Sequence, residues 1–273
     1  MKIVIIGLKN HPATIKLLNK LDNFPQHTFH LLQPIKINYS PKQIANLMKK
    51  TLNKNSDIVK IDRFHINLIF NNLGFFLKLA YYLYFNNKGE CLQNNSNDEY
   101  EDGEKLSISY HLIEKYVRNV NNKKTESWLK KIDPDLIICS SNEPIIRDYI
   151  IKIPKIGIIN THPGILPKYR GMNPIEYTIL NGDVVGATTY FIDSGVDTGN
   201  ILFKSPINSE RLSYIEIKKK MLQLLVDSNV KAIEIIENGN YKLVKQKLDE
   251  GVRFFPIDND LIDLCELKIL RKT

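Results

Sequence analysis

The chain is poor in cysteine. Its 273 residues include three cysteines, Cys91, Cys139 and Cys265, which are widely spaced and form no C-x-x-C pair. An odd number of scattered cysteines argues against a disulfide framework and against a cysteine-ligated zinc site. It fits a reducing compartment, so we predict a cytoplasmic protein that needs no metal.

The chain also lacks a long uninterrupted hydrophobic run. Its most apolar stretch, 64–85, is broken by His65, Asn67, Asn71, Asn72 and Lys78. A membrane-spanning helix needs about 20 consecutive apolar residues, which this stretch does not supply. A packed helix or a helix lying at an interface remain as alternatives. The first residues, with an apolar run of only 3–6, are too short for a signal sequence and typical of a buried strand. We therefore expect no membrane partner.

Acidic residues are outnumbered, since 38 lysines and arginines against 30 aspartates and glutamates give a net charge of +8. An excess of positive charge favours anionic partners, including nucleic acid, membrane surfaces and phosphorylated small molecules. The lysines are scattered or occur in short groups and form no single stripe. This distribution favours a solvated basic surface, so nucleic acid is not the partner that we predict.

What the chain does contain is an alternation of apolar runs and helical patterns. Buried strands are predicted at 2–7, 28–32, 135–141, 156–160 and 186–192, and helices at 11–21, 41–52, 64–84, 124–131, 145–151 and 174–181. This alternation predicts an α/β fold with a Rossmann-like, mostly parallel sheet. Ligands of such sheets bind outside the carboxyl ends of the strands. We expect Gly7, Ser140, Asn160 and Asp193 to mark that edge.

Two other regions differ in character from this core. The segment 64–105 begins with apolar helical periodicity and ends in an acidic, asparagine-rich stretch that predicts a surface loop. Residues 206–273 carry no motif and are predicted to be mainly helical at 213–238. We therefore predict a catalytic domain at 1–205 and a small C-terminal extension at 206–273.

Three polar residues follow predicted strands in a chemically suggestive arrangement. The segment 159–171 reads INTHPGILPKYRG and the segment 193–199 reads DSGVDTG. Acyl transfer to an amine needs an oxyanion donor and a proton carrier, and Asn160 and His162 can fill these roles, with Asp197 orienting the imidazole. Alone, an Asn-x-His pair is a weak signal and Asp197 can be a turn residue.

Together with Gly182-Asp183, these segments closely resemble the signature of the 10-formyltetrahydrofolate-dependent formyltransferases. Asp197 lies 35 residues after His162, close to the family's usual separation. The resemblance is strong over about 135–202 and compatible over 1–7. It implies a formyltransferase fold, 10-formyltetrahydrofolate as co-substrate, and a catalytic triad of Asn160, His162 and Asp197.

The resemblance also implies binding residues. In this family the pterin lies between two loops, and the matching positions here are Ser141, Asn142, Glu143, Pro144 and Ile145 with Ile192 and Asp193. The loop that borders the acceptor matches Lys168, Tyr169, Arg170 and Gly171, whose cations suit phosphate. After the first strand, Asn10 matches the last residue of a phosphate loop, whereas the rest of that loop differs. An exposed turn without a ligand is the alternative for 168–171.

Among family members, the sugar N-formyltransferases fit best, because they combine a catalytic domain with a short, variable C-terminal part that often forms a dimer. This implies a homodimer that formylates a nucleotide-linked, dTDP-linked by preference, amino-dideoxy sugar for a surface polysaccharide such as O-antigen. The segment 64–105 can belong to the sugar-nucleotide pocket or be a surface elaboration. A methionyl-tRNA formyltransferase-like enzyme or a nucleic-acid-binding relative is the alternative, supported by the positive charge. An inactive binding relative is the third hypothesis.

Overall fold

The computed structural model describes residues 1–34, 105–117, 119–140 and 145–270, which belong to one compact unit. The helices predicted at 41–52 and 64–84, and all of the acidic stretch before Lys105, lie outside these residues. So do Cys91 and the predicted pterin contacts from Ser141 to Pro144.

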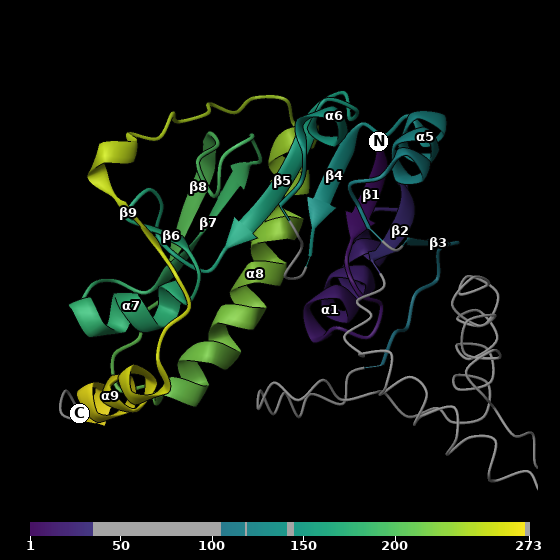
Figure 1. Cartoon of the computed structure of the whole chain (residues 1–273). Coiled ribbons are helices and arrows are strands. Elements are labelled where there is room, and N and C mark those ends of the chain that lie inside the picture. Colours follow the sequence, from purple (N-terminus) through teal and green to yellow (C-terminus); the bar gives the residue numbers. More distant parts are fainter. Residues whose placement is uncertain (35–104, 118, 141–144, 271–273) are drawn as a thin grey trace, which may run out of the picture. The chain divides into compact units, whose positions relative to one another are not determined.

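A seven-stranded sheet forms the centre of this unit, with the strand order β3-β2-β1-β4-β5-β7-β8 (Figure 1). Strands β3, β2, β1, β4 and β5 pair in parallel, whereas β7 is antiparallel to both β5 and β8. The predicted mostly parallel α/β sheet is therefore confirmed. The strands span β1 (Lys2–Ile6), β2 (Thr28–Pro34), β3 (Ile113–Val117), β4 (Leu136–Cys139), β5 (Gly157–His162), β7 (Gly186–Phe191) and β8 (Ile201–Pro206).

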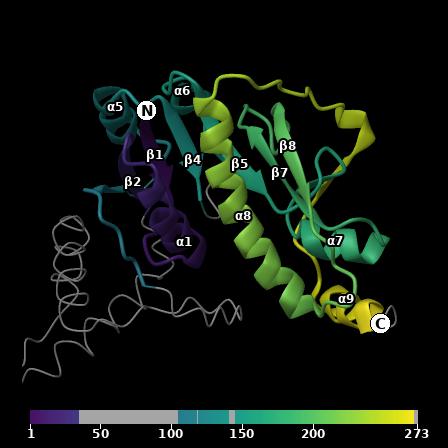
Figure 2. The ribbon, with the colours of Figure 1, turned by 180° about the vertical axis from the view of Figure 1, so that it is seen from behind.

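Helices cover both faces of the sheet because its central strands are apolar on both sides. Ile3 and Ile5 of β1 pack with helices α1 (Pro12–Lys20) and α8 (Tyr214–Glu237). Val4 and Ile6, which alternate with them, join the opposite cluster with α5 (Lys123–Ile132) and α6 (Asp148–Ile151). Figure 2 shows α1 and α8 together in front of the sheet.

A smaller layer follows β5. Strand β6 (Tyr169–Gly171) pairs in parallel with β9 (Val252–Phe254), and helix α7 (Pro174–Asn181) packs against α9 (Asn259–Leu270). Helix α7 has proline in its first turn and ends at Gly182 with a φ of 74°, as the sequence predicts. Short 3₁₀ turns occur at Leu21–Asn23 and Leu248–Glu250.

The direction of β7 corrects one expectation from the sequence. We expected Asp193 at the same sheet edge as Gly7, Ser140 and Asn160. Because β7 runs antiparallel to β5, its end lies instead beside the start of β5, where the amide of Ile192 donates to the Ile158 carbonyl at 2.7 Å. Asp193 therefore leaves the sheet at the end opposite to His162.

Helix α8 ties the segment after residue 205 to this core. It begins with a capping box, in which Ser213 and Glu216 satisfy each other's backbone amides, and it contacts α1, β5 and β7. Its buried side chains include Val226 and Ile233. The division into 1–205 and 206–273 stays a prediction about the sequence, while α8 contributes to the main core.

Candidate active site

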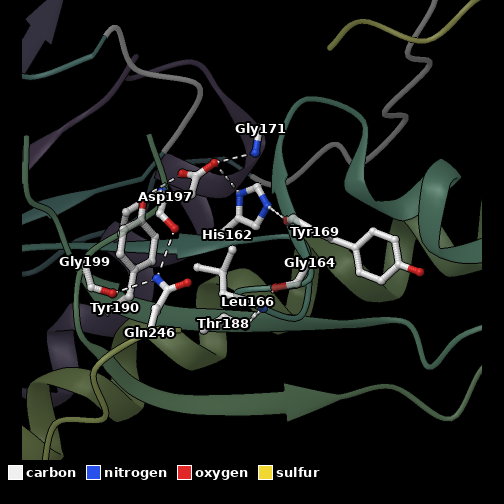
Figure 3. A network of polar contacts seen from close by, with 11 residues as sticks. His162, Gly164, Leu166, Tyr169, Gly171, Thr188, Tyr190, Asp197, Gly199 and Gln246 are labelled. Atoms are coloured by element: carbon white, nitrogen blue, oxygen red, sulfur yellow. Dashed lines mark hydrogen bonds and ion pairs between the residues drawn. The ribbon is translucent and has the colours of Figure 1, made fainter. Parts of the chain in front are cut away.

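The imidazole of His162 lies at the end of β5 and is 5% exposed. Its Nε2 is 2.7 Å from the backbone carbonyl of Tyr169, and its Nδ1 is 3.6 Å from Oδ2 of Asp197 (Figure 3). A carbonyl oxygen can only accept, so Nε2 carries a proton and donates to it. In the neutral ring, Nδ1 therefore keeps its lone pair and faces the carboxylate.

Burial lowers the pKa of His162 below its usual 6.5, against the opposing effects of Asp197 and the Tyr169 carbonyl. Desolvation disfavours the charged imidazolium, and the neighbouring carboxylate limits that effect. The ring is consequently neutral near neutral pH, with Nδ1 able to take a proton. The imidazolium formed in that way would lie directly beside Asp197.

Asp197 is held in place by its own backbone and by two donors. Its φ of 55° lies in the left-handed region, which aspartate adopts more readily than most residues. The Gly171 amide donates to Oδ2 at 2.7 Å, and the Tyr190 hydroxyl donates to Oδ1 at 2.8 Å. The carboxylate is 13% exposed and is thus fixed opposite the imidazole.

Asn160 joins the same network through Tyr190. Its Nδ2 donates to the Tyr190 hydroxyl at 3.3 Å, and the two residues are partners across strands β5 and β7. Tyr190 is 4% exposed. The structure thus brings the three predicted triad residues into one network, linked by a tyrosine that the sequence motif did not indicate.

The turn after His162 is supported from β7 as well. The Thr188 hydroxyl donates to the Gly164 carbonyl at 2.8 Å and accepts from the Leu166 amide at 3.0 Å. A Cβ on Gly164 would lie 2.9 Å from the Tyr169 carbonyl oxygen and 3.1 Å from the His162 ring. Glycine is therefore required where the backbone passes close to the imidazole.

The side chains of the loop 168–171 contact other parts of the protein. Lys168 forms an ion pair with Asp183 at 2.6 Å, and the Tyr169 hydroxyl donates to the same carboxylate. Arg170 donates from one terminal nitrogen to the carbonyls of Leu248 and Gly251 at 3.2 and 3.0 Å. Arg170 Nε is buried and meets no acceptor among the described residues. The phosphate contacts predicted for this loop stay a prediction.

Gln246 is a second residue that sequence reasoning missed. It is 7% exposed, and its Nε2 donates to the carbonyls of Asp197 and Gly199 at 3.0 and 2.7 Å. The Gln246 side chain therefore holds the backbone on both sides of Thr198 by hydrogen bonds (Figure 3). Gln246 lies in no recognisable sequence motif, so only the folded structure identifies its hydrogen-bond partners.

The remaining predicted contacts lie at other places, except that Ile192 packs against the cluster that contains Tyr190. Asn10 is exposed after β1, and the side chain of Ile145 is 62% exposed before α6. Ile192 is half-buried, and the Asp193 carboxylate accepts from the Gly195 amide and the Thr198 hydroxyl. The described part of the predicted pterin site thus offers an exposed aliphatic side chain, with the rest of that loop outside the described residues.

Within the ranges that the structure describes, His, Cys, Asp and Glu form no group of three or more that could hold a metal ion. In those same ranges no helix combines the length and apolar character that crossing a membrane demands. A cavity of about 390 Å³ lies near α7 and the end of α9, lined by Asp183 and Lys268 among others and by none of the triad residues.

Comparison with known proteins gives this geometry a context. Residues 91–222 match the family model described as formyl transferase. Over 133 residues the chain is 35% identical to a methionyl-tRNA formyltransferase of Clostridioides difficile, a match that covers 48% of this chain and 43% of that protein. The chain spans less than half the length of the curated relatives that it matches.

Solved structures share the fold over more of the chain. A sugar N-formyltransferase from a Shewanella species superposes with a TM-score of 0.56 at 16% identity, covering 99% of this chain and 88% of that one. An N-formyltransferase from Helicobacter canadensis, solved with folinic acid and dTDP-3-aminofucose, gives a TM-score of 0.51 at 19% identity, covering 93% and 70%. At such identities the likeness establishes the fold.

Proposed function

We propose, from the match of residues 91–222 to the formyl transferase family model, that the protein is an N-formyltransferase that uses 10-formyltetrahydrofolate. The observation that carries the proposal is the network of Asn160, His162 and Asp197. It combines an amide donor and a neutral histidine on strand β5 with a carboxylate from the loop between β7 and β8.

Each residue has a defined role in the proposed reaction. When bound, 10-formyltetrahydrofolate would supply the formyl group, which passes from N10 to the acceptor amine. His162 Nδ1 takes the proton that the amine loses, directly or through one water, and returns it toward the departing nitrogen. Asp197 stabilises the imidazolium between these steps. Asn160 donates to the formyl oxygen while negative charge develops on it.

We propose a nucleotide-linked amino sugar, dTDP-linked by preference, as the acceptor. The proposal is supported by the fold shared with a sugar N-formyltransferase over 88% of that chain and by the net positive charge, which favours a pyrophosphate. The same proposal includes a role in surface polysaccharide synthesis, a homodimer and a cytoplasmic location. It also includes a catalytic part at 1–205 with an extension at 206–273.

A second acceptor is favoured by a different observation. The curated relative named above is a methionyl-tRNA formyltransferase, 35% identical over 133 residues. Initiator methionyl-tRNA is therefore the alternative acceptor, and the Asn160, His162 and Asp197 chemistry would be the same for both amines.

The deciding experiment incubates the protein with 10-formyltetrahydrofolate and a panel of acceptors, and detects formylated products by mass spectrometry. The panel holds dTDP-, UDP- and GDP-linked amino sugars, initiator methionyl-tRNA and glycinamide ribonucleotide. We expect a formylated amino sugar with the wild type and with His111→Ala, which alters an exposed histidine before β3, and none with His162→Ala. If tRNA alone is formylated, initiator methionyl-tRNA replaces the amino sugar as the proposed acceptor. If no acceptor is formylated, the proposal is refuted.

A further inference from the structure

Tyr190 is a buried tyrosine whose hydroxyl contacts two of the three triad residues. It donates to Oδ1 of Asp197 at 2.8 Å and accepts from Nδ2 of Asn160 at 3.3 Å, while its side chain is 4% exposed. The phenol is therefore almost fully shielded from solvent. Among the described residues, its hydroxyl acts on the site through these two partners.

The direction of the protons in this network follows from simple chemistry. An ionised carboxylate only accepts, so the single proton of the Tyr190 hydroxyl points to Asp197 and its oxygen is left to accept from Asn160. Burial and the nearby Asp197 charge raise the pKa of Tyr190 well above its usual 10, so the hydroxyl stays protonated. The amide of Asn160 is thereby oriented with Nδ2 toward Tyr190.

We propose that Tyr190 is the positioning residue of this site, orienting the Asn160 amide and holding the Asp197 carboxylate opposite His162. One hydrogen of Asn160 Nδ2 is directed to Tyr190, and the other is left to donate to the formyl oxygen. The catalytic meaning of this inference rests on the proposed function. The coupling of Tyr190 to His162 through Asp197 exists in the protein without substrate.

Strand β7 explains how one residue can reach both partners. Tyr190 lies directly across from Asn160 in the antiparallel register, and Thr188, two residues earlier, shares its face and supports the turn after His162. The pairing of β7 with β8 shifts register between Thr189 and Tyr190. One face of β7 therefore contacts Asn160 and Asp197 through Tyr190, and the turn after His162 through Thr188.

The coupling has a sign that can be measured. Among the described residues, the groups that act on the His162 pKa are Asp197 and the Tyr169 carbonyl, both of which raise it, while burial lowers it. The Tyr190 hydroxyl draws part of the Asp197 negative charge into a hydrogen bond. Without that hydroxyl, the carboxylate attracts a proton on His162 more strongly. Loss of the hydroxyl should therefore raise the pKa of His162.

The first test follows His162 by NMR in the substrate-free protein, with its signals assigned by their loss in His162→Gln. We expect the midpoint of the His162 titration to move to higher pH in Tyr190→Phe. It should stay in place in Tyr110→Phe, which removes a hydroxyl that donates to the Leu18 carbonyl at 2.9 Å. A folded Tyr190→Phe protein with an unmoved His162 midpoint would overturn the inference.

A variant that keeps the hydroxyl guards against misfolding. Replacing Tyr190 by 3-fluorotyrosine makes the phenol a stronger donor, so the His162 midpoint should move to lower pH. The same midpoint for tyrosine and fluorotyrosine would count against the coupling.

The second test is kinetic and uses the acceptor identified by mass spectrometry. In Tyr190→Phe we expect kcat to fall about tenfold, less than the 10²–10³-fold cost of removing an oxyanion donor outright. The KM values should stay unchanged, and the acid limb of the kcat/KM profile should move to higher pH. Equal kcat and an unmoved limb would contradict the inference. A wild-type protein without transfer activity would refute the proposed function, and the NMR titration would still decide the inference.

Discussion

Two neighbouring regions of the molecule use their polar residues in opposite ways. On β5 and β7, Asn160 donates to Tyr190, while Tyr190 and His162 both face Asp197. At β6, Lys168, just before the strand, binds Asp183, and Arg170 within it donates to carbonyls of the segment 248–251. With the exception of Tyr190, the sequence predicts a functional role for both sets. The difference teaches that a cation beside a catalytic motif can be engaged in holding the fold together, which charge alone does not reveal.

The largest effect expected from the β5–β7 side is that of His162. His162→Ala removes the proton acceptor, and we expect transfer to fall by roughly 10²–10⁴-fold, the usual value of general acid–base catalysis. Circular dichroism should show an unchanged fold, and His111→Ala should keep wild-type rates. Substantial activity in His162→Ala would remove the triad from the mechanism and with it the contrast between the two regions.

Asn160→Ala tests the oxyanion donor on the same side. We expect a loss of about 2.7–4 kcal/mol of transition-state stabilisation, roughly 10²–10³-fold in kcat, with KM little changed. Steady-state kinetics with saturating formyl donor provide the measurement. A loss smaller than about tenfold would assign Asn160 a positioning role instead.

Gln246→Leu tests whether the C-terminal segment supports the site. The substitution leaves the Asp197 and Gly199 carbonyls without their donor, and we expect unfolding to become easier by about 1–3 kcal/mol. Urea denaturation measures the change. Gln223→Leu, on the exposed side of α8, serves as the control, because its amide pairs with exposed Asp227. Equal stability of both variants would show that the Gln246 contacts contribute nothing.

Acid should weaken both activity and stability through His162. Its pKa is lower in the folded protein than the usual 6.5, so the unfolded chain binds more protons as the pH falls below 6.5. The stability from a neutral His162 is complete above pH 6.5 and is lost as the pH falls toward the folded pKa. Denaturant titrations of wild type and His162→Gln should differ in pH dependence within that window. Parallel curves would contradict the assignment.

The smallest effect on stability is expected at Lys168, whose side chain is 56% exposed. An exposed ion pair contributes about 0–1 kcal/mol, so Lys168→Ala should leave the unfolding free energy nearly unchanged. The informative quantity is the acceptor KM. A rise in KM would show that Lys168 also meets the substrate, and an unchanged KM would assign it to Asp183 alone.

Much of this architecture was predictable from short-range patterns. Continuous apolar runs gave β1, β4 and β5, and Pro174 with Gly182 marked the two ends of α7. The direction of β7 was not predictable, because a buried strand looks alike in either direction and the helix before it resembles a parallel crossover. The pairing of β6 with β9 joins residues about 80 positions apart that share no pattern.

The site divides in the same manner. Asn160, His162 and Asp197 were predictable because each lies in a short sequence motif that resembles a family signature. Tyr190 and Gln246 were not, because a cross-strand register and a long-range hydrogen bond decide what their polar atoms meet. Likewise, Arg170 looked free for a phosphate because the carbonyls of Leu248 and Gly251 come from a distant part of the chain.

The hydrogen bonds from Gln246 to the backbone around Asp197 have a consequence for how the protein folds during synthesis. A ribosome releases the chain from the N-terminus, so all three triad residues emerge before Gln246 and before strand β9. Until Gln246 and β9 pack onto the rest of the protein, the Asp197 loop lacks the hydrogen bonds from Gln246, and β6 lacks its partner strand. We therefore expect the nascent polypeptide to become competent only after Gln246 and β9 have emerged.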